Sequence, residues 1–393
     1  MASPAPRRVI ILVADGVGCG GAPDAAAYGD AGADTLGNLA RAQGGLALPN
    51  LAALGLGHVT SIAGVPAVAA PEGAYGSMVE ASAGKDTITG HWEMAGLVTE
   101  VPFVTFPDGF PARITEPLAR AAGRGLIGNR PASGTAIIEE LGPEHERTGA
   151  LILYTSGDSV LQLAAHEDVV PVDELHRICA IAREIADRES IGRVIARPFV
   201  GAAGAYRRTY NRRDFAAMPP GPTLLDAVTA AGMAVVGVGK ISDIFAGRGV
   251  EESIHSEGNE DGMRLTRQVL DGMDGGGLLF VNLVDFDMVY GHRNDAPGFA
   301  AALEHLDAWI PTLRAGLRHG DVVLLSADHG NDPTKRGTDH TRERVPLLAF
   351  GPGVRPVPLG ARPSFADLGQ TVATALGVAP LARGVSFWET IRP

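Results

Sequence analysis

The chain has 393 residues, and 45 Asp and Glu against 33 Lys and Arg give a formal net charge of −12. This acidic balance argues against nucleic acid or an anionic membrane as a partner, and the 45% hydrophobic content excludes a disordered chain. Two cysteines are too few for a disulfide framework, and no apolar stretch reaches the roughly 18 residues of a membrane span. We therefore expect a cytoplasmic protein.

Short runs of Val, Ile and Leu that end in polar or Gly-rich turns predict buried strands of a mostly parallel sheet. In chain order they cover residues 9–14, 234–239, 278–284, 322–325 and 346–350. Apolar residues at helical spacing predict a helix over residues 297–317. Strands that alternate with helices predict an α/β core, with the sheet lying between two layers of helices.

The middle of the chain has strand candidates of its own at residues 151–155 and 194–196 and an amphipathic helix over residues 172–186. It therefore predicts a second, smaller α+β domain. Chemistry-bearing strand ends occur on both sides of this region, so the domain would be an insertion. The expected division is a core first part at residues 1–100, an inserted domain at 101–218 and a core second part at 219–393.

Carboxylates and imidazoles follow three of the predicted core strands. Asp15 follows the first, Asp287 and His292 follow residues 278–284, and Asp328 and His329 follow residues 322–325. Ligands bind beyond the carboxyl ends of parallel strands, so these groups should meet in one cleft. Asp15 alone could merely start a turn.

With His340, which follows shortly after, the set offers three ligands to each of two divalent ions such as zinc, manganese or magnesium. Two ions about 3.5–4 Å apart can clamp the attacking and leaving oxygens of an in-line displacement, so the set indicates hydrolysis or phosphoryl transfer. Most other histidines are expected to be structural residues on polar helix faces or turns: His58, His145, His176, His305 and His319. For His91, His166 and His255 the sequence does not decide between a structural role and metal binding.

Residues 82–93 bring hydroxyls together with Gly, Lys and Asp before a helical pattern. A threonine at a helix start could carry a phosphoryl group against free backbone amides, or it could simply cap the helix. The Gly-Lys pair is followed by Asp86, so this is not a P-loop. The residues alone do not choose among Ser82, Thr87 and Thr89.

Five segments together are similar to the alkaline phosphatase superfamily, and within it to the bacterial metal-dependent phosphopentomutase family, over essentially the whole chain. They are Asp15, residues 85–93, the run that ends at His292, residues 328–332 and residues 337–341. The resemblance implies an alkaline-phosphatase-like core with an inserted cap. It also implies one metal on Asp15, Asp328 and His329, the other on Asp287, His292 and His340, Mn²⁺ as the favoured ion, and Thr87 as the phosphorylated residue.

The implied activity is that of an isomerase in nucleoside catabolism. It interconverts α-D-ribose 1-phosphate, or 2-deoxyribose 1-phosphate, with the 5-phosphate through phosphothreonine and a sugar bisphosphate, which could also act as an activator. Lys85 would add positive charge beside Thr87, or it is a surface lysine. The partners are small pentose phosphates, and the sequence leaves the oligomeric state open.

A mutase must also hold the phosphate that does not react, and arginine suits this because its planar fork binds phosphate in a bidentate way. The resemblance favours Arg193, Arg208 and Lys240 for this phosphate, Asp158 for a sugar hydroxyl and Ile195 as a cover for the ring. In each case a plainer alternative exists: a solvated basic face, a closed turn or a core residue.

Two other functions fit the same ligand types. The nearer one is a phosphomonoesterase or a cofactor-independent phosphoglycerate mutase, and the other is a binding protein without catalytic activity. A hydrolase lets water reach the phosphoenzyme, whereas a mutase keeps water away until the sugar accepts the phosphoryl group.

Overall fold

The computed structural model describes residues 8–156 and 159–392 of the chain. The chain divides into two compact units: unit 1 comprises residues 1–100 and 219–393, and unit 2 comprises residues 101–218. Within the described ranges, no helix combines the length and the apolar character needed to cross a membrane.

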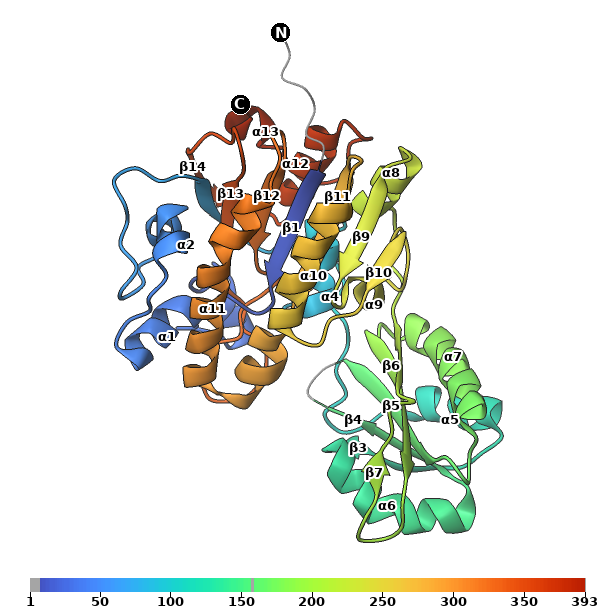
Figure 1. Cartoon of the computed structure of the whole chain (residues 1–393). Coiled ribbons are helices and arrows are strands. Elements are labelled where there is room, and N and C mark those ends of the chain that lie inside the picture. The colour runs from blue at the N-terminus through green and yellow to red at the C-terminus, as the bar shows by residue number, and fades with distance from the viewer. Residues whose placement is uncertain (1–7, 157–158, 393) are drawn as a thin grey trace. The chain divides into compact units, whose positions relative to one another are not determined.

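Unit 1 is built on an eight-stranded sheet with the strand order β10-β9-β11-β1-β12-β13-β2-β14 (Figure 1). The five strands from β10 to β12 run parallel to one another. The strand bounds are β1 Arg8–Ala14, β2 Ala74–Met78, β9 Ala234–Val238, β10 Glu252–Ile254, β11 Gly277–Leu283, β12 Val322–Ser326, β13 Val345–Phe350 and β14 Pro358–Arg362.

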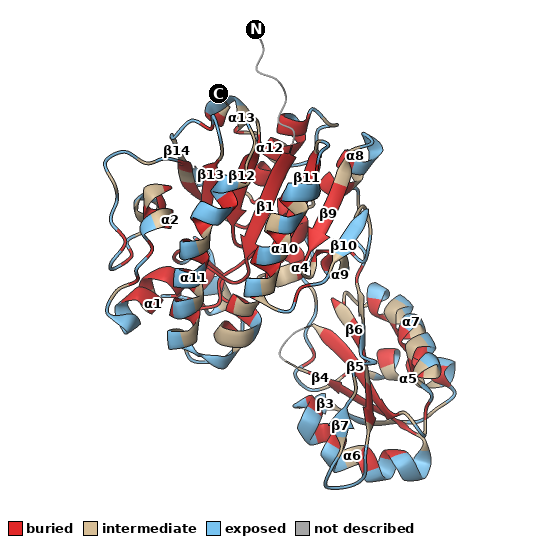
Figure 2. Cartoon of the chain, viewed as in Figure 1, coloured by how far each residue is buried: buried red, intermediate tan, exposed pale blue. Residues whose placement is uncertain are grey.

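The central strand β1 has the sequence RVIILVA, and all seven residues are buried. A strand without polar alternation needs cover on both faces, and Figure 1 shows α10 and α11 in front of the sheet with α4 and α12 behind it. Figure 2 shows the resulting buried core along β1, β11 and β12. The helices of unit 1 are α1 Thr35–Gln43, α2 Pro49–Ala53, α3 Leu56–Val59, α4 Thr87–Met94, α8 Leu224–Ala230, α9 Ile241–Ile244, α10 Asn259–Gly272, α11 Ala296–Ala315, α12 Ala366–Leu376 and α13 Trp388–Ile391, with short turns η1 Ala25–Tyr28, η2 Phe286–Tyr290 and η3 Gly291–Arg293.

The predicted α/β class, with a mostly parallel sheet between helices, is confirmed. One strand departs from the expectation: β13, predicted among the parallel strands, runs antiparallel to both β12 and β2. All six of its residues are buried. An unbroken apolar run reports burial on both faces, but it carries no information about strand direction.

Unit 2 is a six-stranded mixed sheet with the order β3-β4-β5-β6-β7, and β8 pairs with β6. One apolar core cluster includes residues of α5 and α7, while α6 packs through Ile137 and Ile138 into a second cluster that includes Ile152 and Phe199. The element bounds are β3 Leu126–Pro131, β4 Leu151–Thr155, β5 Val160–His166, β6 Arg193–Val200, β7 Arg207–Arg208, β8 Arg213–Ala216, α5 Ala112–Ala122, α6 Gly134–Thr148 and α7 Val172–Arg188.

His145, expected on a polar face or turn, is instead fully buried within unit 2. Its Nδ1 lies 2.6 Å from the carbonyl oxygen of Ala150, and its Nε2 accepts a hydrogen bond from the backbone N–H of His166 at 2.8 Å. The ring therefore connects the end of α6 to β5. The structural role was predicted correctly, but the exposed position was wrong.

Candidate metal centre

The carboxyl ends of three adjacent strands deliver the predicted ligands of unit 1. Asp15 follows β1 directly, Asp328 comes two residues after β12, and Asp287 lies in the single π-helical turn η2 after β11. Because β1 pairs with β11 on one side and with β12 on the other, these three strand ends are neighbours in the sheet. Single turns of π-helix are rare and are frequent at functional sites.

Asp15, Asp328 and His329 form one compact group. One ligand atom from each lies within 4.8 Å of the others. The Nε2 atom of His329 is 3.4 Å from Oδ1 of Asp15 and 3.3 Å from Oδ2 of Asp328. All three side chains are buried.

Asp287, His329 and His340 form a second group of the same size, so His329 belongs to both groups. His292 lies beside this second group. Its Nε2 atom is 3.2 Å from Oδ2 of Asp287 and 3.2 Å from Nε2 of His340. The structure thus brings all six predicted ligands into one continuous cluster.

The charges of this cluster fit a cation between the side chains. Burial, together with the neighbouring charges of Asp328 and Asp287, raises the pKa of the Asp15 carboxyl well above its usual value. Burial opposes ionisation of Asp328 as well, but His329 and His91 outweigh it and lower the pKa of that carboxyl to about 2.

Two buried carboxylate oxygens of the cluster, Oδ1 of Asp15 and Oδ2 of Asp328, accept no well-aligned hydrogen bond from the described residues and have only imidazole nitrogens at 3.2–3.4 Å. Buried carboxylate oxygens normally accept a hydrogen bond or bind an ion. These two oxygens are therefore available as metal ligands. Carboxylate oxygen with imidazole nitrogen suits divalent ions of the zinc, manganese and magnesium type. The residues present therefore fit the metals that the sequence implies.

Two asparagine side chains fix the orientation of Asp15 and Asp287. Asn282 donates from Nδ2 to Oδ2 of Asp15 at 2.7 Å, and Asn331 donates in the same way to Oδ1 of Asp287 at 2.6 Å. His91, which the sequence left undecided, is fully buried with its Nδ1 atom 3.2 Å from Oδ2 of Asp328. Sequence reasoning missed both asparagines. The available signals were an amide one residue before the end of β11 and an amide two residues after His329.

The three candidate hydroxyls now differ in their contacts. Thr87 is the first residue of α4, and its Oγ1 lies 3.1 Å from Nε2 of His329. Thr89 donates to the Asp86 carboxylate at 2.6 Å, and Ser82 accepts from the backbone N–H of Thr99 at 3.0 Å. Thr87 is the one of the three whose hydroxyl contacts the metal-type cluster.

The expectation for the amides of this helix start needs correction. Asp86, rather than either threonine, is the N-cap, and its Oδ1 accepts the backbone N–H groups of Ile88 and Thr89 at 3.0 and 3.1 Å. Those two amides are therefore already satisfied. Lys85 forms ion pairs with Asp30 at 3.1 Å and with Asp339 at 3.0 Å, so its charge is shared with two carboxylates.

The predicted substrate contacts are spread over both units. In unit 2, Arg193, Ile195 and Arg197 alternate along β6 with Val194 and Ala196, which belong to the core beneath α7, so the first three share the opposite face. Arg208 lies further along, opposite Phe199 of β6. Asp158 lies outside the described residues.

Lys240 belongs to unit 1, where it precedes α9. Its Nζ atom lies 3.6 Å from Sδ of Met288. Its positive charge also favours ionisation of Asp15 and so opposes the rise in the pKa of that carboxyl. Within unit 1, Lys240 is therefore electrostatically linked to the metal-type cluster.

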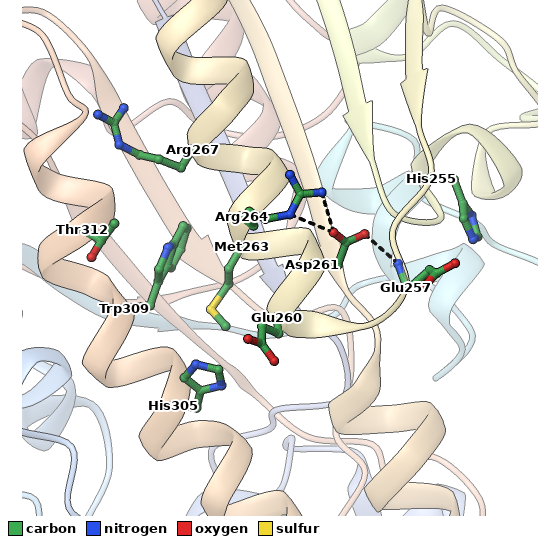
Figure 3. Close-up of a pocket in the computed structure, with 10 residues that line it drawn as sticks. All are labelled: His255, Glu257, Glu260, Asp261, Met263, Arg264, Arg267, His305, Trp309 and Thr312. Carbon is green, nitrogen blue, oxygen red and sulfur yellow. Dashed lines mark hydrogen bonds and ion pairs between the residues drawn. The ribbon is translucent and has the colours of Figure 1, made fainter.

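A separate groove of about 890 Å³ lies between α10 and α11 (Figure 3). Its lining contains none of the six clustered ligands. Two of the charged residues drawn there are engaged locally, since Asp261 accepts a hydrogen bond from Arg264 at 2.7 Å and another from the backbone N–H of Glu257 at 3.0 Å. This groove is therefore distinct from the candidate metal centre.

Comparison with known proteins identifies the class of this chain. A model of the Metalloenzyme superfamily matches residues 7–380, so the chain belongs to that superfamily. The solved structure of the PH0037 protein from Pyrococcus horikoshii shares the fold, with a TM-score of 0.50 and 15% identity over 95% of this chain and 98% of that chain.

Two curated relatives narrow the class. A protein named Phosphopentomutase from Anaeromyxobacter sp. is 58% identical over 373 residues, covering 95% of this chain and 96% of the relative. A second Phosphopentomutase, from Thermotoga petrophila, is 53% identical over 97% of this chain and 100% of the relative. The chain is therefore a member of the phosphopentomutase family and an isomerase, which confirms the resemblance seen in the sequence.

Proposed function

We propose that this enzyme interconverts α-D-ribose 1-phosphate, or 2-deoxyribose 1-phosphate, with the corresponding 5-phosphate. The observation that carries the proposal is the contact between the Thr87 hydroxyl and His329, the residue common to both groups of metal-type ligands. Family membership supports the same reaction. Two cysteines that are both buried and free agree with a cytoplasmic enzyme.

In the proposed site, Asp15, Asp328 and His329 hold one divalent cation, and Asp287, His292 and His340 hold the other, with Mn²⁺ as the favoured ion. When bound, such cations neutralise the charge that develops on the equatorial oxygens of a transferring phosphoryl group. The close approach of His292 to both Asp287 and His340 supports its place in the second set.

Thr87 is the proposed phosphoryl carrier. Phosphothreonine donates its phosphoryl group to the free hydroxyl of the sugar phosphate: the bond from phosphorus to the threonine oxygen breaks, and a bond to the sugar oxygen forms. The sugar bisphosphate then returns its other phosphoryl group to Thr87. Added sugar bisphosphate would act as an activator, because it phosphorylates an enzyme that has lost the group.

The phosphate that does not react needs a second anion site. We propose Arg193 and Arg208 of unit 2 for it, with Ile195 covering the sugar ring and Asp158 accepting a sugar hydroxyl. Lys240 of unit 1 is proposed separately as a phosphate contact within its own unit. In this proposal residues 101–218 serve as a cap domain inserted into the core.

Positive charge on unit 2 supports this part of the proposal. A Cβ at Gly134, the first residue of α6, would collide with the Arg208 guanidinium. The buried Tyr154 hydroxyl lies at the same place, next to the Arg208 guanidinium. Burial and the charges of Arg212 and Arg208 lower the pKa of Arg197 to about 10, so this part of unit 2 gathers several cations that repel one another.

The reaction is tested by incubating the Mn²⁺-loaded, phosphorylated enzyme with ribose 5-phosphate and following the products by phosphorus NMR. We expect ribose 1-phosphate to accumulate. Inorganic phosphate as the sole product would show a phosphomonoesterase instead, and 3-phosphoglycerate offered as an alternative substrate separates the phosphoglycerate mutase activity.

The carrier is tested by intact-mass measurement. Wild-type enzyme treated with a pentose bisphosphate should gain the mass of one phosphoryl group, and Thr87→Ala should not. Thr89→Ala is the matched control, because Thr89 sits two residues along the same helix start with its hydroxyl on Asp86. A mass gain that persists in Thr87→Ala would refute the assignment.

A further inference from the structure

The side chain of Arg342 lies between the segment that carries His340 and the loop that precedes Thr87. It comes two residues after His340, and its side chain is only 3% exposed. The guanidinium reaches from the His340 segment to the loop between β2 and α4, and α4 begins at Thr87. Arg342 therefore joins the segment of a candidate ligand to the segment of the candidate nucleophile.

The bonds of this guanidinium reach most of that loop. Nη1 donates to Oε2 of Glu80 at 2.6 Å, to the carbonyl oxygen of Ser82 at 2.9 Å and to that of Gly84. Nη2 donates to the carbonyl oxygen of Glu80 at 2.7 Å. Three backbone carbonyls within five residues are therefore held by one side chain, directly before Lys85, Asp86 and Thr87.

The remaining contacts hold Arg342 itself in place. Its Nε donates to Asp24 at 3.1 Å, its backbone N–H donates to Asp30 at 2.9 Å, and the guanidinium lies over the Tyr28 ring at 4.8 Å. Asp30 also pairs with Lys85, which pairs in turn with Asp339. The segments around Lys85 and His340 are thus connected twice, once through Arg342 and once through Lys85.

A buried ion pair such as that between Arg342 and Glu80 is a weak source of stability, because both charges lose their hydration. Such pairs can instead specify one arrangement of the chain. In this chain the geometry at stake is the distance between the Thr87 hydroxyl and the imidazole of His329. Displacement of a reacting group by about 1 Å can reduce the rate on the order of 10²-fold.

We propose that Arg342 is a positioning residue, which fixes the loop at residues 80–84 and so sets the Thr87 hydroxyl against His329 for phosphoryl transfer. The proposal rests on the proposed function for its kinetic consequence, but its structural consequence does not depend on any activity. A purely structural arginine would alter stability without selectively altering turnover.

The test compares Arg342→Lys with a matched control, Arg362→Lys. The Arg362 side chain also pairs with a buried carboxylate, Asp367, donates to the carbonyl oxygen of Val385 and lies over the Phe387 ring. Among the described residues its guanidinium has no hydrogen bond or ion pair to residues 80–84, and its backbone oxygen, which the substitution keeps, accepts the N–H of Val79 at 2.9 Å. Lysine keeps the charge and loses the fork that reaches several acceptors.

For Arg342→Lys we expect kcat to fall on the order of 10²-fold, with KM and the bound metal content unchanged and with faster amide hydrogen exchange at residues 80–89. Arg362→Lys should leave kcat and that exchange at wild-type values. An equal kcat in Arg342→Lys and Arg362→Lys, or loss of metal from Arg342→Lys, would overturn the proposal.

Two further measurements separate positioning by Arg342 from a loss of folding and from a failure of the proposed function. Arg342→Ala should regain turnover when guanidinium ion is added at concentrations that leave Arg362→Ala unaffected, and failure of rescue with intact metal and fold would count against positioning. If the wild-type enzyme converted no pentose phosphate, the proposed function would fail, whereas the exchange rates at residues 80–89 would still decide whether Arg342 holds the loop.

Discussion

At the scale of single residues, the candidate centre is organised by groups that carry no charge. Each of two acids has one oxygen fixed by an asparagine: Asn282 bonds Asp15, and Asn331 bonds Asp287. An amide donor orients a carboxylate without neutralising it, so the negative charge stays available to a cation. Partners of this kind typically contribute 10- to 100-fold to metal affinity or activity, as an order of magnitude.

We predict that Asp328→Ala loses one of the two proposed metals and that turnover falls at least on the order of 10²-fold, because a proposed ligand oxygen in a buried site is removed. Metal content by mass spectrometry and initial rates check this. Asp285→Asn is the control, since Asp285 lies at the same sheet edge but accepts the backbone N–H of Asn259 instead. Unchanged metal content and activity in Asp328→Ala would contradict the assignment.

The acids Asp15, Asp287 and Asp328, with His292 and His329, were predicted as ligands because they follow apolar strands, and His340 was added because it comes shortly after them. Their partners could not be predicted. Nothing in the order of residues shows that Asn282, inside a strand, faces Asp15, because that contact depends on the pairing of β1 with β11. Arg342 was missed for the same reason, since its partners lie more than 250 residues away.

At the scale of elements, helix α4 is placed by a close approach of two backbones. A Cβ added to Gly90 would collide with the carbonyl oxygen of Asp328. Glycine therefore lets the helix that carries Thr87 lie directly against the loop that carries two candidate ligands. One turn before Gly90, Asp86 caps the same helix, so both its start and its packing face are fixed.

Gly90→Ala should therefore destabilise the protein and reduce turnover, although alanine is the better helix former by about 1 kcal/mol. Thermal unfolding and initial rates measure the two effects. The control is Gly272→Ala at the end of α10, where an added Cβ meets nothing within 4 Å, and the expected change there is neutral or slightly stabilising. A stabilised, fully active Gly90→Ala would show that the two backbones do not constrain each other.

Element directions show the limit of reasoning from periodicity. The apolar runs predicted β1, β9, β11 and β12 and their burial, because a strand covered on both faces needs no polar alternation. The same pattern in β13 belongs to an antiparallel neighbour. Direction depends on the connection between strands, and the loop from Ala327 to Arg344 returns the chain from β12 to β13 without a helical crossover.

At the scale of the whole molecule, stability should depend on pH through His145 of unit 2. Burial lowers the pKa of this imidazole from its usual 6.5. The geometry agrees, because Nε2 accepts the N–H of His166 and has no room for a proton of its own. The unfolded chain then binds more protons than the folded chain below about pH 6.5, so stability is lost as the pH falls through that value.

We expect amide exchange in β4 and β5, corrected for the intrinsic rate, to accelerate between about pH 8 and about pH 5. In His145→Gln, where no group titrates at this position, the acceleration should be smaller, although the variant is less stable at the higher pH. Identical pH profiles for the two proteins would show that His145 does not couple protonation to the stability of unit 2.

The place of β1 in the sheet also has a consequence for synthesis on the ribosome. Its two neighbours, β11 and β12, are made more than 260 residues later, at residues 277–283 and 322–326. At a translation rate of roughly 5–20 residues per second, β1 remains without its partner strands for on the order of 15–60 s. Residues 101–218 are contiguous in sequence and can fold during this time. Nascent chains stalled before residue 277 should therefore show protease-resistant unit 2 and a β1 segment bound by chaperones, and early protection of β1 would refute this order of events.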